Sequence, residues 1–295
     1  MAALIQVSSP ALEPVTLAEI KQFLRVDAGD TSQDATLLDL ITSARSWAEV
    51  FTKKAFVLQT WTLLLDYFPG YYAMVTGQPG SSPVLTGPAL LAGIRYAIVL
   101  PFPPVIAITN FQYHNADGGV TVMNPATDFI QDLQSNPARL TPPFGQMWPV
   151  ALVVLNAVQV TFQSGYAVPI DVTGPQGSPA EPNLIAAGAY TFQATDVDRP
   201  IMIPGAGPAG GTLNTIVEGV SSPLSSEATL RYMLTTPVSN QPSLLVNNEN
   251  GPARHWSQIR TGIKFKVKSD FHPSLDVDYE KKAKMALMPV RDIRI

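Results

Sequence analysis

Histidine is rare and cysteine is absent in this chain, and the histidines are not spaced for chemistry. No histidine has a second histidine or an acidic residue at the spacing of a metal site; the three are His114, His255 and His272. The absence of cysteine excludes disulfides, thiolate metal sites and cysteine catalysis. The sequence therefore predicts no metal site.

Carboxylate pairs and a glycine-rich stretch also fall short of a catalytic pattern. Asp196 and Asp198, like Asp276 and Asp278, are spaced for one face of a strand, and nothing marks either pair as a general acid and base. The stretch GAGPAGG at 205–211 lacks the Lys-Ser/Thr that follows a phosphate-binding loop. We therefore expect no enzyme and no cofactor.

Composition favours a subunit that is buried against neighbours. Of 295 residues, 46% are hydrophobic and 14% are charged, below the roughly 25% of an ordinary soluble domain. No apolar run approaches the roughly 20 residues of a membrane helix, and residues 1–4 lack the basic start of a signal peptide. We expect a protein without a membrane contact that assembles in a cytoplasm.

The N-terminal region reads as a helical hairpin. Thr16 and Glu19 have the spacing of a capping box, which predicts a helix over 16–26. Apolar residues at three- and four-residue spacing predict a second helix over 32–53. The residues expected at the core of this helix are Leu37, Ile41, Trp47 and Phe51.

From residue 57 the pattern changes to that of β-strands, and a β-rich body is expected over 57–166. Residues 70–95 read as a long loop. The stretch PFPPVIAITNFQYHNADGGVTVMN at 101–124 predicts a hairpin, because Asp-Gly-Gly supplies the positive φ angles of a tight turn. Its projecting tip comprises Asn115, Asp117, Gly118 and Gly119.

The C-terminal part carries weaker signals. Residues 170–270 read as an added segment rich in loops and strands, with short helices expected near 184–190 and 227–234. The alternation in 263–268 (IKFKVK) predicts a strand with lysines on one face. Residues 271–295 are expected to hold a final helix near 278–288 and an extended tail. The tail consists of Arg291, Asp292, Ile293, Arg294 and Ile295.

These elements give an α+β fold: a helical hairpin packed on a β-rich body with a projecting hairpin, an added β-rich segment, and a final short helix. Residues 1–169 are expected to form one domain, followed by the added segment and the C-terminal helix. The last 51 residues hold 10 basic and 6 acidic residues, a local charge of +4 within a chain of net charge −4. This asymmetry predicts an acidic partner for the C-terminus.

Several motifs, in this order, resemble the head–tail connector family of tailed bacteriophages. The segment at 14–27 (PVTLAEIKQFLRVD) resembles its first helix, and Glu49 with TKKA at 52–55 resembles the end of its long helix. LPFPPV at 100–105 and the Asp-Gly turn resemble its hairpin entry, and 148–169 its closing strand. The finish EKKAKMALMPVR at 280–291 also resembles the family.

This resemblance implies a structural virion protein at the head–tail neck. Such a protein forms a ring of about twelve subunits between the portal protein and the tail or tail-completion protein. It extends the DNA channel after genome packaging, and double-stranded DNA passes through the lumen without sequence-specific binding. The resemblance also implies that the hairpin tip meets a neighbouring subunit or the tail, and that the tail at 291–295 docks on the portal.

A second class of function stays open. The added segment could instead make the chain a virion-surface or tail-side module that binds a receptor or a carbohydrate. Such a module needs aromatic side chains grouped on one face, and residues 170–254 contain only Tyr190, Phe192 and Tyr232. A cell-wall hydrolase would need an acid and base pair in a cleft, and no such pair is marked.

Overall fold

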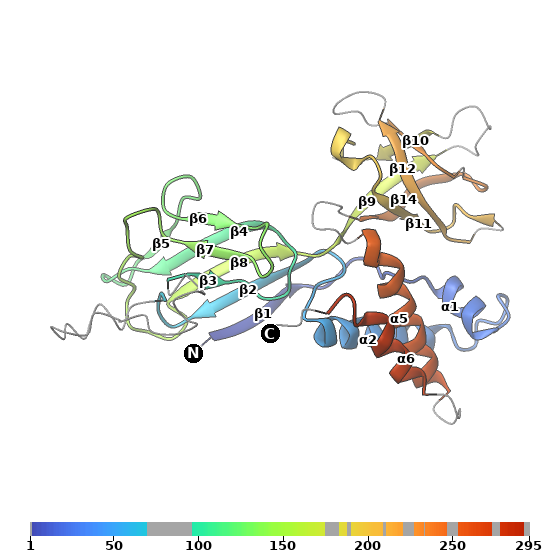
Figure 1. The fold of residues 1–295 in the computed structure, drawn as a ribbon, viewed down its shortest axis with the longest axis horizontal. Coiled ribbons are helices and arrows are strands. Elements are labelled where there is room, and N and C mark those ends of the chain that lie inside the picture. Colours follow the sequence, from blue (N-terminus) through green and yellow to red (C-terminus); the bar gives the residue numbers. More distant parts are fainter. Residues whose placement is uncertain are drawn as a thin grey trace. The chain divides into compact units, whose positions relative to one another are not determined.

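The computed structural model describes residues 2–69, 96–174, 183–187, 190–208, 211–220, 227–232, 234–246, 253–272 and 278–291 (Figure 1). The chain divides into two compact units that are both discontinuous in sequence. The first unit comprises Met1–Ser9 and Gln59–Ser164, and the second comprises Pro10–Leu58 and Gly165–Ile295. The predicted loop over 70–95 lies outside the described residues.

The first unit is built on a five-stranded antiparallel sheet in the order β1-β2-β8-β4-β5. Its strands are β1 (Ala2–Ser8), β2 (Gln59–Leu65), β8 (Val158–Ser164), β4 (Val105–His114) and β5 (Val120–Val122). A second sheet has the order β3-β7-β6, with β3 (Ile98–Val99), β7 (Arg139–Thr141) and β6 (Ile130–Asp132). The β-rich body expected over 57–166 is confirmed by these strands, whereas β1 was not predicted.

One face of the five-stranded sheet carries the core of the first unit. Leu63, Val160 and Phe111 lie opposite one another on the three central strands, and all three are buried. Ile98 and Leu140 of the smaller sheet belong to the same apolar cluster, so that sheet covers this face. Because side chains alternate along a strand, the neighbouring residues point to the opposite face.

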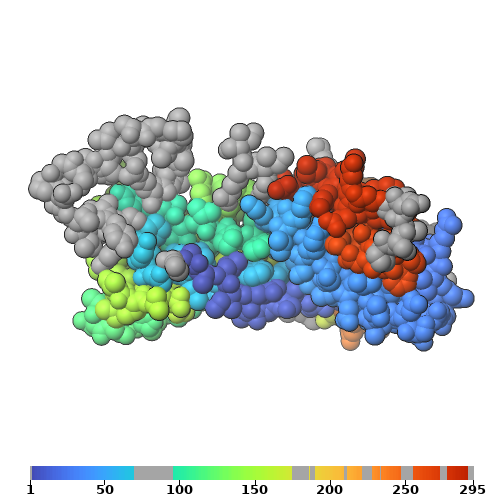
Figure 2. All heavy atoms as spheres, turned by 90° about the horizontal axis from the view of Figure 1, so that it is seen from below, coloured from blue at the N-terminus to red at the C-terminus, as the bar shows by residue number. Residues whose placement is uncertain are grey.

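Helices from both ends of the chain pack together in the second unit. They are α1 (Leu17–Leu24), α2 (Asp34–Thr52), α5 (Ala253–Phe271) and α6 (Tyr279–Leu287). Leu37 and Ile41 of α2 share one apolar cluster with Ile259 and Ile263 of α5. In Figure 2 the red C-terminal helices lie against the blue N-terminal helices. The predicted helical hairpin is therefore confirmed, and α5 completes its core.

The strand predicted over 263–268 is wrong, because these residues lie inside α5. Buried apolar residues recur through the helix at three- and four-residue spacing, at Trp256, Ile259, Ile263 and Val267. Six residues of alternation fit a strand, but the longer window has the helical period. The lysines therefore lie around a helix and do not line one face of a strand.

The remaining strands of the second unit form a closed barrel in the order β10-β13-β12-β11-β14-β9. They are β9 (Ala167–Gly174), β10 (Asn183–Ala187), β11 (Pro200–Ile203), β12 (Leu213–Val220), β13 (Glu227–Leu230) and β14 (Val238–Val246), with a 3₁₀ turn η1 (Ala194–Asp196). Phe192, Ile201 and Val217 belong to the buried cluster of this barrel. The helices predicted near 184–190 and 227–234 are wrong, because strands β10 and β13 begin there.

The α+β fold class is confirmed. The described residues contain an N-terminal helical hairpin, mostly antiparallel sheets that include the β4–β5 hairpin, and a final short helix at 279–287. Each of these features was expected from the sequence.

Gly165 allows two stretches of backbone to approach closely in the second unit. The N–H groups of Tyr166 and Ala167 both donate to the carbonyl of Phe56, and Leu58 N–H donates to Ala167. Gly165 has φ +148°, and a Cβ atom added there would lie 2.5 Å from the backbone of Val57 and Leu58. No side chain fits this position.

We expect Gly165→Ala to lower the free energy of unfolding by about 2–5 kcal/mol, because backbone strain and a backbone clash add together. Gly118→Ala is the matched control. Gly118 has φ +84° but nothing within 4 Å of an added Cβ atom, so its loss should be about 1 kcal/mol. Urea unfolding measures the free energy of both variants. Equal losses of stability would contradict the close approach of the backbone at Gly165 to that of Val57 and Leu58.

Candidate assembly interface

The capping box predicted at the start of α1 is present and has a second role. Thr16 Oγ1 accepts a hydrogen bond from Glu19 N–H at 3.3 Å, and Thr16 N–H donates to Glu19 Oε2 at 3.2 Å. The other carboxylate oxygen of Glu19 forms an ion pair with Arg260 of α5. The first helix is thus capped and tied to the C-terminal helices by one side chain.

Arg260 joins three segments that are far apart in sequence. Its Nε donates to Pro14 O at 3.0 Å, and its Nη1 donates to Asn214 Oδ1 of β12 at 2.7 Å. Burial raises the pKa of Glu19, but the charge and hydrogen bond of Arg260 outweigh that effect, and the pKa is lowered overall. Glu19 is therefore held ionised beside Arg260.

Lys21 closes the loop between α1 and α2. Its Nζ donates to Asp30 O at 2.7 Å and lies 2.5 Å from a carboxylate oxygen of Asp34, and its side chain is buried. Arg25, with φ 62°, ends α1 in the left-handed conformation that reverses the chain. The residues that carry the motif at 14–27 thus hold the helix, its end and the following loop.

Glu49 holds the turn that follows α2. Its Oε1 accepts from Phe56 N–H at 2.9 Å, and its Oε2 accepts from Arg45 Nη1 at 2.7 Å. Arg45 Nε donates to Glu13 Oε2 at 2.8 Å, so two carboxylates share one guanidinium. Burial raises the pKa of Glu49 to about 6, although Arg45 acts in the opposite direction.

The four residues predicted for the core of α2 separate into two groups. Leu37 and Ile41 are fully buried, whereas Trp47 and Phe51 are only half-buried. The Trp47 and Phe51 rings stack with centroids 5.5 Å apart. The Nζ atom of Lys266 lies 5.3 Å from the centre of the Trp47 ring. A positively charged ammonium group therefore covers this end of α2 together with apolar side chains.

The predicted hairpin tip is a turn held by Asn115. Its Oδ1 accepts from the N–H groups of Asp117 at 3.1 Å and Gly119 at 2.9 Å, and its own N–H donates to Gly119 O at 2.8 Å. Gly118 takes the positive φ angle. The structure brings Asn115, Asp117, Gly118 and Gly119 together, and their contact with another subunit or the tail stays a prediction.

An exposed apolar loop follows the smaller sheet and was missed by the sequence analysis. Phe144 is 100% exposed and Leu155 is 83% exposed, and four more apolar residues of the loop are exposed: Met147, Val150, Val153 and Val154. The loop contacts the end of the hairpin, since Leu152 N–H donates to His114 O. The run of apolar letters from 147 to 155 was the available signal, but burial could not be read from it.

Only the first residue of the predicted portal-docking tail is described. Arg291 lies over the Phe51 ring, 4.9 Å from its centre. Val290, directly before it, is buried in the helical core. Asp292, Ile293, Arg294 and Ile295 lie outside the described residues, so the docking role of the tail remains a prediction.

The residues that first suggested chemistry are not brought together. Asp196 is buried and binds Arg199, Tyr190 Oη and Gln193 N–H, whereas Asp198 is exposed. In the part of the chain that the structure describes, histidine and acidic side chains form no group of three that could hold a metal. None of the described helices combines the length and the apolar character of a membrane span.

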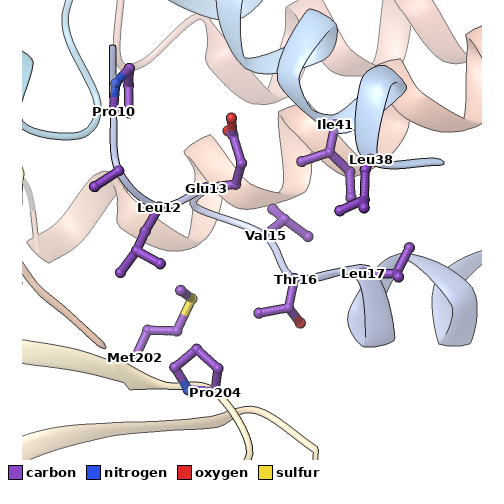
Figure 3. A pocket seen from close by; sticks show the side chains of 11 residues that line it. Pro10, Leu12, Glu13, Val15, Thr16, Leu17, Leu38, Ile41, Met202 and Pro204 are labelled. Carbon is purple, nitrogen blue, oxygen red and sulfur yellow. The ribbon is translucent and has the colours of Figure 1, made fainter. Parts of the chain in front are cut away.

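A small apolar pocket of about 230 Å³ lies in the second unit (Figure 3). Leu12 and Val15 line it from the segment before α1, Ile41 lines it from α2, and Met202 and Pro204 line it from the β11 side. Glu13 contributes its carboxylate, which Arg45 and Thr42 already hold. The pocket could take one apolar side chain, and it has no group suited to catalysis.

The N-terminal helices and the strand after them match a known family. Residues 14–84 match the family model described as phage gp6-like head-tail connector protein. The predicted connector resemblance is confirmed. The match contains Thr16, Glu19, Lys21 and Glu49, which hold α1, α2 and the turns that follow them in place. Comparison with curated proteins gives no match.

Three solved structures of gene transfer agent (GTA) particles show a low similarity to this chain. The neck of an empty particle with C6 symmetry has 20% identity, covers 56% of this chain and 71% of that chain, and has a TM-score of 0.39. The virion of a native particle has 20% identity, 55% and 71% coverage, and a TM-score of 0.39. The native neck with C12 symmetry has 18% identity, 56% and 70% coverage, and a TM-score of 0.34.

The raised pKa of Glu49 gives a testable pH dependence. Below the ordinary glutamate pKa of 4.5, the carboxyl is protonated in both the folded and the unfolded chain. The stability that the neutral, buried carboxyl contributes is then fully present. The contribution is lost as the pH rises through about 6, since the buried carboxyl must then ionise. Relative to Glu49→Gln, the protein should lose about 2 kcal/mol of unfolding free energy between pH 4.5 and 7.

Urea unfolding across this pH range measures the difference between the two proteins. Glu218→Gln is the control, because Glu218 is exposed and its loss should leave the pH dependence unchanged. If Glu49→Gln and the unchanged protein kept a constant stability difference, the assignment of the buried carboxyl would be wrong.

Proposed function

We propose that this protein is a structural component of a phage neck, where copies form a ring between the portal protein and the tail. The observation that carries the proposal is the match of residues 14–84 to the connector family. The structure supports it, because the matched motif residues hold the helical hairpin together. The protein would extend the DNA channel and complete the head after packaging.

The surface of the first unit supports assembly into a larger particle. Phe144, Val153 and Leu155 expose apolar side chains in one loop, an arrangement that monomeric proteins avoid. The low charge content of 14% agrees with burial against neighbours. Membership of a homo-oligomer explains both features.

The proposed lumen passes double-stranded DNA without binding it tightly. The net charge of −4 per chain repels the phosphate backbone, and twelve copies would carry 12 × −4 = −48. Two lysines of α5 are held within the chain: Lys266 lies 2.7 Å from Asp270, and Lys268 lies over the Phe23 and Tyr279 rings. Neither lysine side chain is available to bind the DNA backbone.

The alternative function, a receptor- or carbohydrate-binding module, finds less support. Of the three aromatic residues that could form a stacking surface, Phe192 is buried and Tyr190 binds Asp196. Tyr232 alone is well exposed, at 59%. A single exposed ring does not make a stacking platform.

Negative-stain microscopy of the purified full chain, alone and mixed with its portal protein, tests the proposed function. We expect closed rings that stack on the portal.

A charge placed in the exposed apolar loop should weaken the ring. Leu155→Asp should reduce assembly, whereas Val50→Asp on the exposed face of α2 should not. A monodisperse monomer that ignores the portal would overturn the proposal.

The C-terminal tail is a proposed portal contact, and it can be tested separately. A deletion must begin at residue 292 and not at 290, because Val290 is buried in the helical core. Deleting 292–295 should leave the melting temperature unchanged and abolish binding to portal-bearing heads. Binding equal to that of the full chain would remove the tail from the interface.

A further inference from the structure

Among the described residues, no further strand pairs with either edge of the five-stranded sheet of the first unit. In the part of the chain that the structure describes, β1 pairs only with β2, and β5 pairs only with β4. Six of the seven residues of β1 are exposed, and Val120 and Val122 of β5 are 55% and 63% exposed. Both edges therefore present backbone groups to the surroundings.

Neither edge strand carries the charges or prolines that discourage pairing with another chain, and the one register shift of β1 lies at its end, between Gln6 and Ser8. Monomeric proteins protect sheet edges with charged residues, prolines or bulges directed away from partners. The sequences of β1 (AALIQVS) and β5 (VTV) contain no charged residue and no proline. Directly after β5, Met123 N–H donates to Phe111 O, so the backbone groups of Val122 and Val120 point away from β4 by alternation.

The two edge strands contribute to one face of the sheet, and the strand residues on that face carry no charge. None of the five strands contains Asp, Glu, Lys or Arg. One row of facing residues crosses the whole sheet on the face opposite the core: Ala3, Leu64, Gln159, Gln112 and Val122. Gln112 Nε2 donates to Gln159 Oε1 at 3.1 Å along this row. Ile5, 51% exposed, lies on the same face two residues from Ala3.

Strand direction decides how the edges can meet. All four neighbouring pairs in the sheet are antiparallel, so β1 and β5 point the same way. A rotation that preserves strand direction would bring β5 of one copy beside β1 of the next as a parallel pair. The two edges differ, so the contact is head-to-tail and can close into a ring.

We infer that β1 of one copy pairs with β5 of the next, so that the sheet continues from subunit to subunit. The partner is a second copy of this chain. Backbone hydrogen bonds hold the strands, and Ile5 packs beside Val120 and Val122 on the uncharged face. The inference rests on the proposed ring and adds the surface through which its subunits join.

Cysteine cross-linking tests the inference directly, because the chain has no cysteine of its own. Neighbouring strands lie about 4.8 Å apart, so facing cysteines come within disulfide reach. Two double variants, Ile5→Cys with Val120→Cys and Ile5→Cys with Val122→Cys, cover adjacent registers on one face. On oxidation, one of them should give a ladder of covalent oligomers on a denaturing gel.

The single variants serve as matched controls. Each alone should stay monomeric on the gel, and a mixture of the two single variants whose double variant forms the ladder should give covalent dimers and nothing larger. Ile5→Cys paired with Val50→Cys of α2 should give no ladder. A dimer from Ile5→Cys alone would show that β1 pairs with β1, which would overturn the inference.

Microscopy of the same samples separates this inference from the proposed function. Rings without a ladder in either double variant would overturn the edge contact and leave the ring standing. A ladder from open chains without rings would support the edge contact and overturn the ring. Monomers without cross-links would overturn both.

A charge substitution keeps the inference testable if a double variant fails to fold. Val122→Lys should abolish assembly at an unchanged melting temperature, and Val50→Lys serves as the control. Intact rings from folded Val122→Lys would overturn the edge contact.

Discussion

The burial of one face of α5 against α1 and α2 is the interaction on which the second unit depends. Without it, the apolar stripe of α2 would face water, and the two N-terminal helices would be too short to hold each other. Ile259, Ile263 and Val267 supply the apolar surface, and Arg260 fixes the orientation by reaching Pro14, Glu19 and Asn214. The chain must therefore complete nearly its whole length before its first helices gain their full core.

Buried charges recur wherever the helical segment changes direction. Lys21 closes the loop before α2, and Arg45 with Glu49 holds the turn after it. A buried ion pair costs desolvation, and it is tolerated only where further hydrogen bonds satisfy the remaining donors and acceptors. Here those bonds go to backbone groups that would otherwise be unpaired at a helix end or a tight turn. The charges thus determine the path of the chain more than they add to its stability.

Elements with complete local signals were predictable from the sequence, and elements that depend on distant partners were not. The capping box and the apolar stripe gave α1 and α2 nearly to their ends, and the Asp-Gly-Gly turn gave the β4–β5 hairpin. In α5, the alternation of 263–268 imitates a strand because Phe265 is apolar on the side that faces Phe23 and Tyr279. Strand β1 was missed because it has one partner strand, β2, more than 50 residues away. Among the interface residues, the turn at Asn115 was recognisable, whereas the exposure of Leu155 could not be distinguished from burial by residue type.

The residues that carry the family resemblance and the residues available to partners are different sets. Thr16, Glu19, Lys21 and Glu49 bind other parts of the same chain, so a match on them indicates how the segment folds and leaves the choice of partner to other surfaces. Exposed uncharged surface occurs instead in the first unit, on the apolar loop and the edges of the five-stranded sheet. An uncharged contact loses little on removal from water and is weakly affected by salt, because it has few ions to desolvate. Such a surface suits a permanent junction between copies better than a reversible contact with a charged polymer.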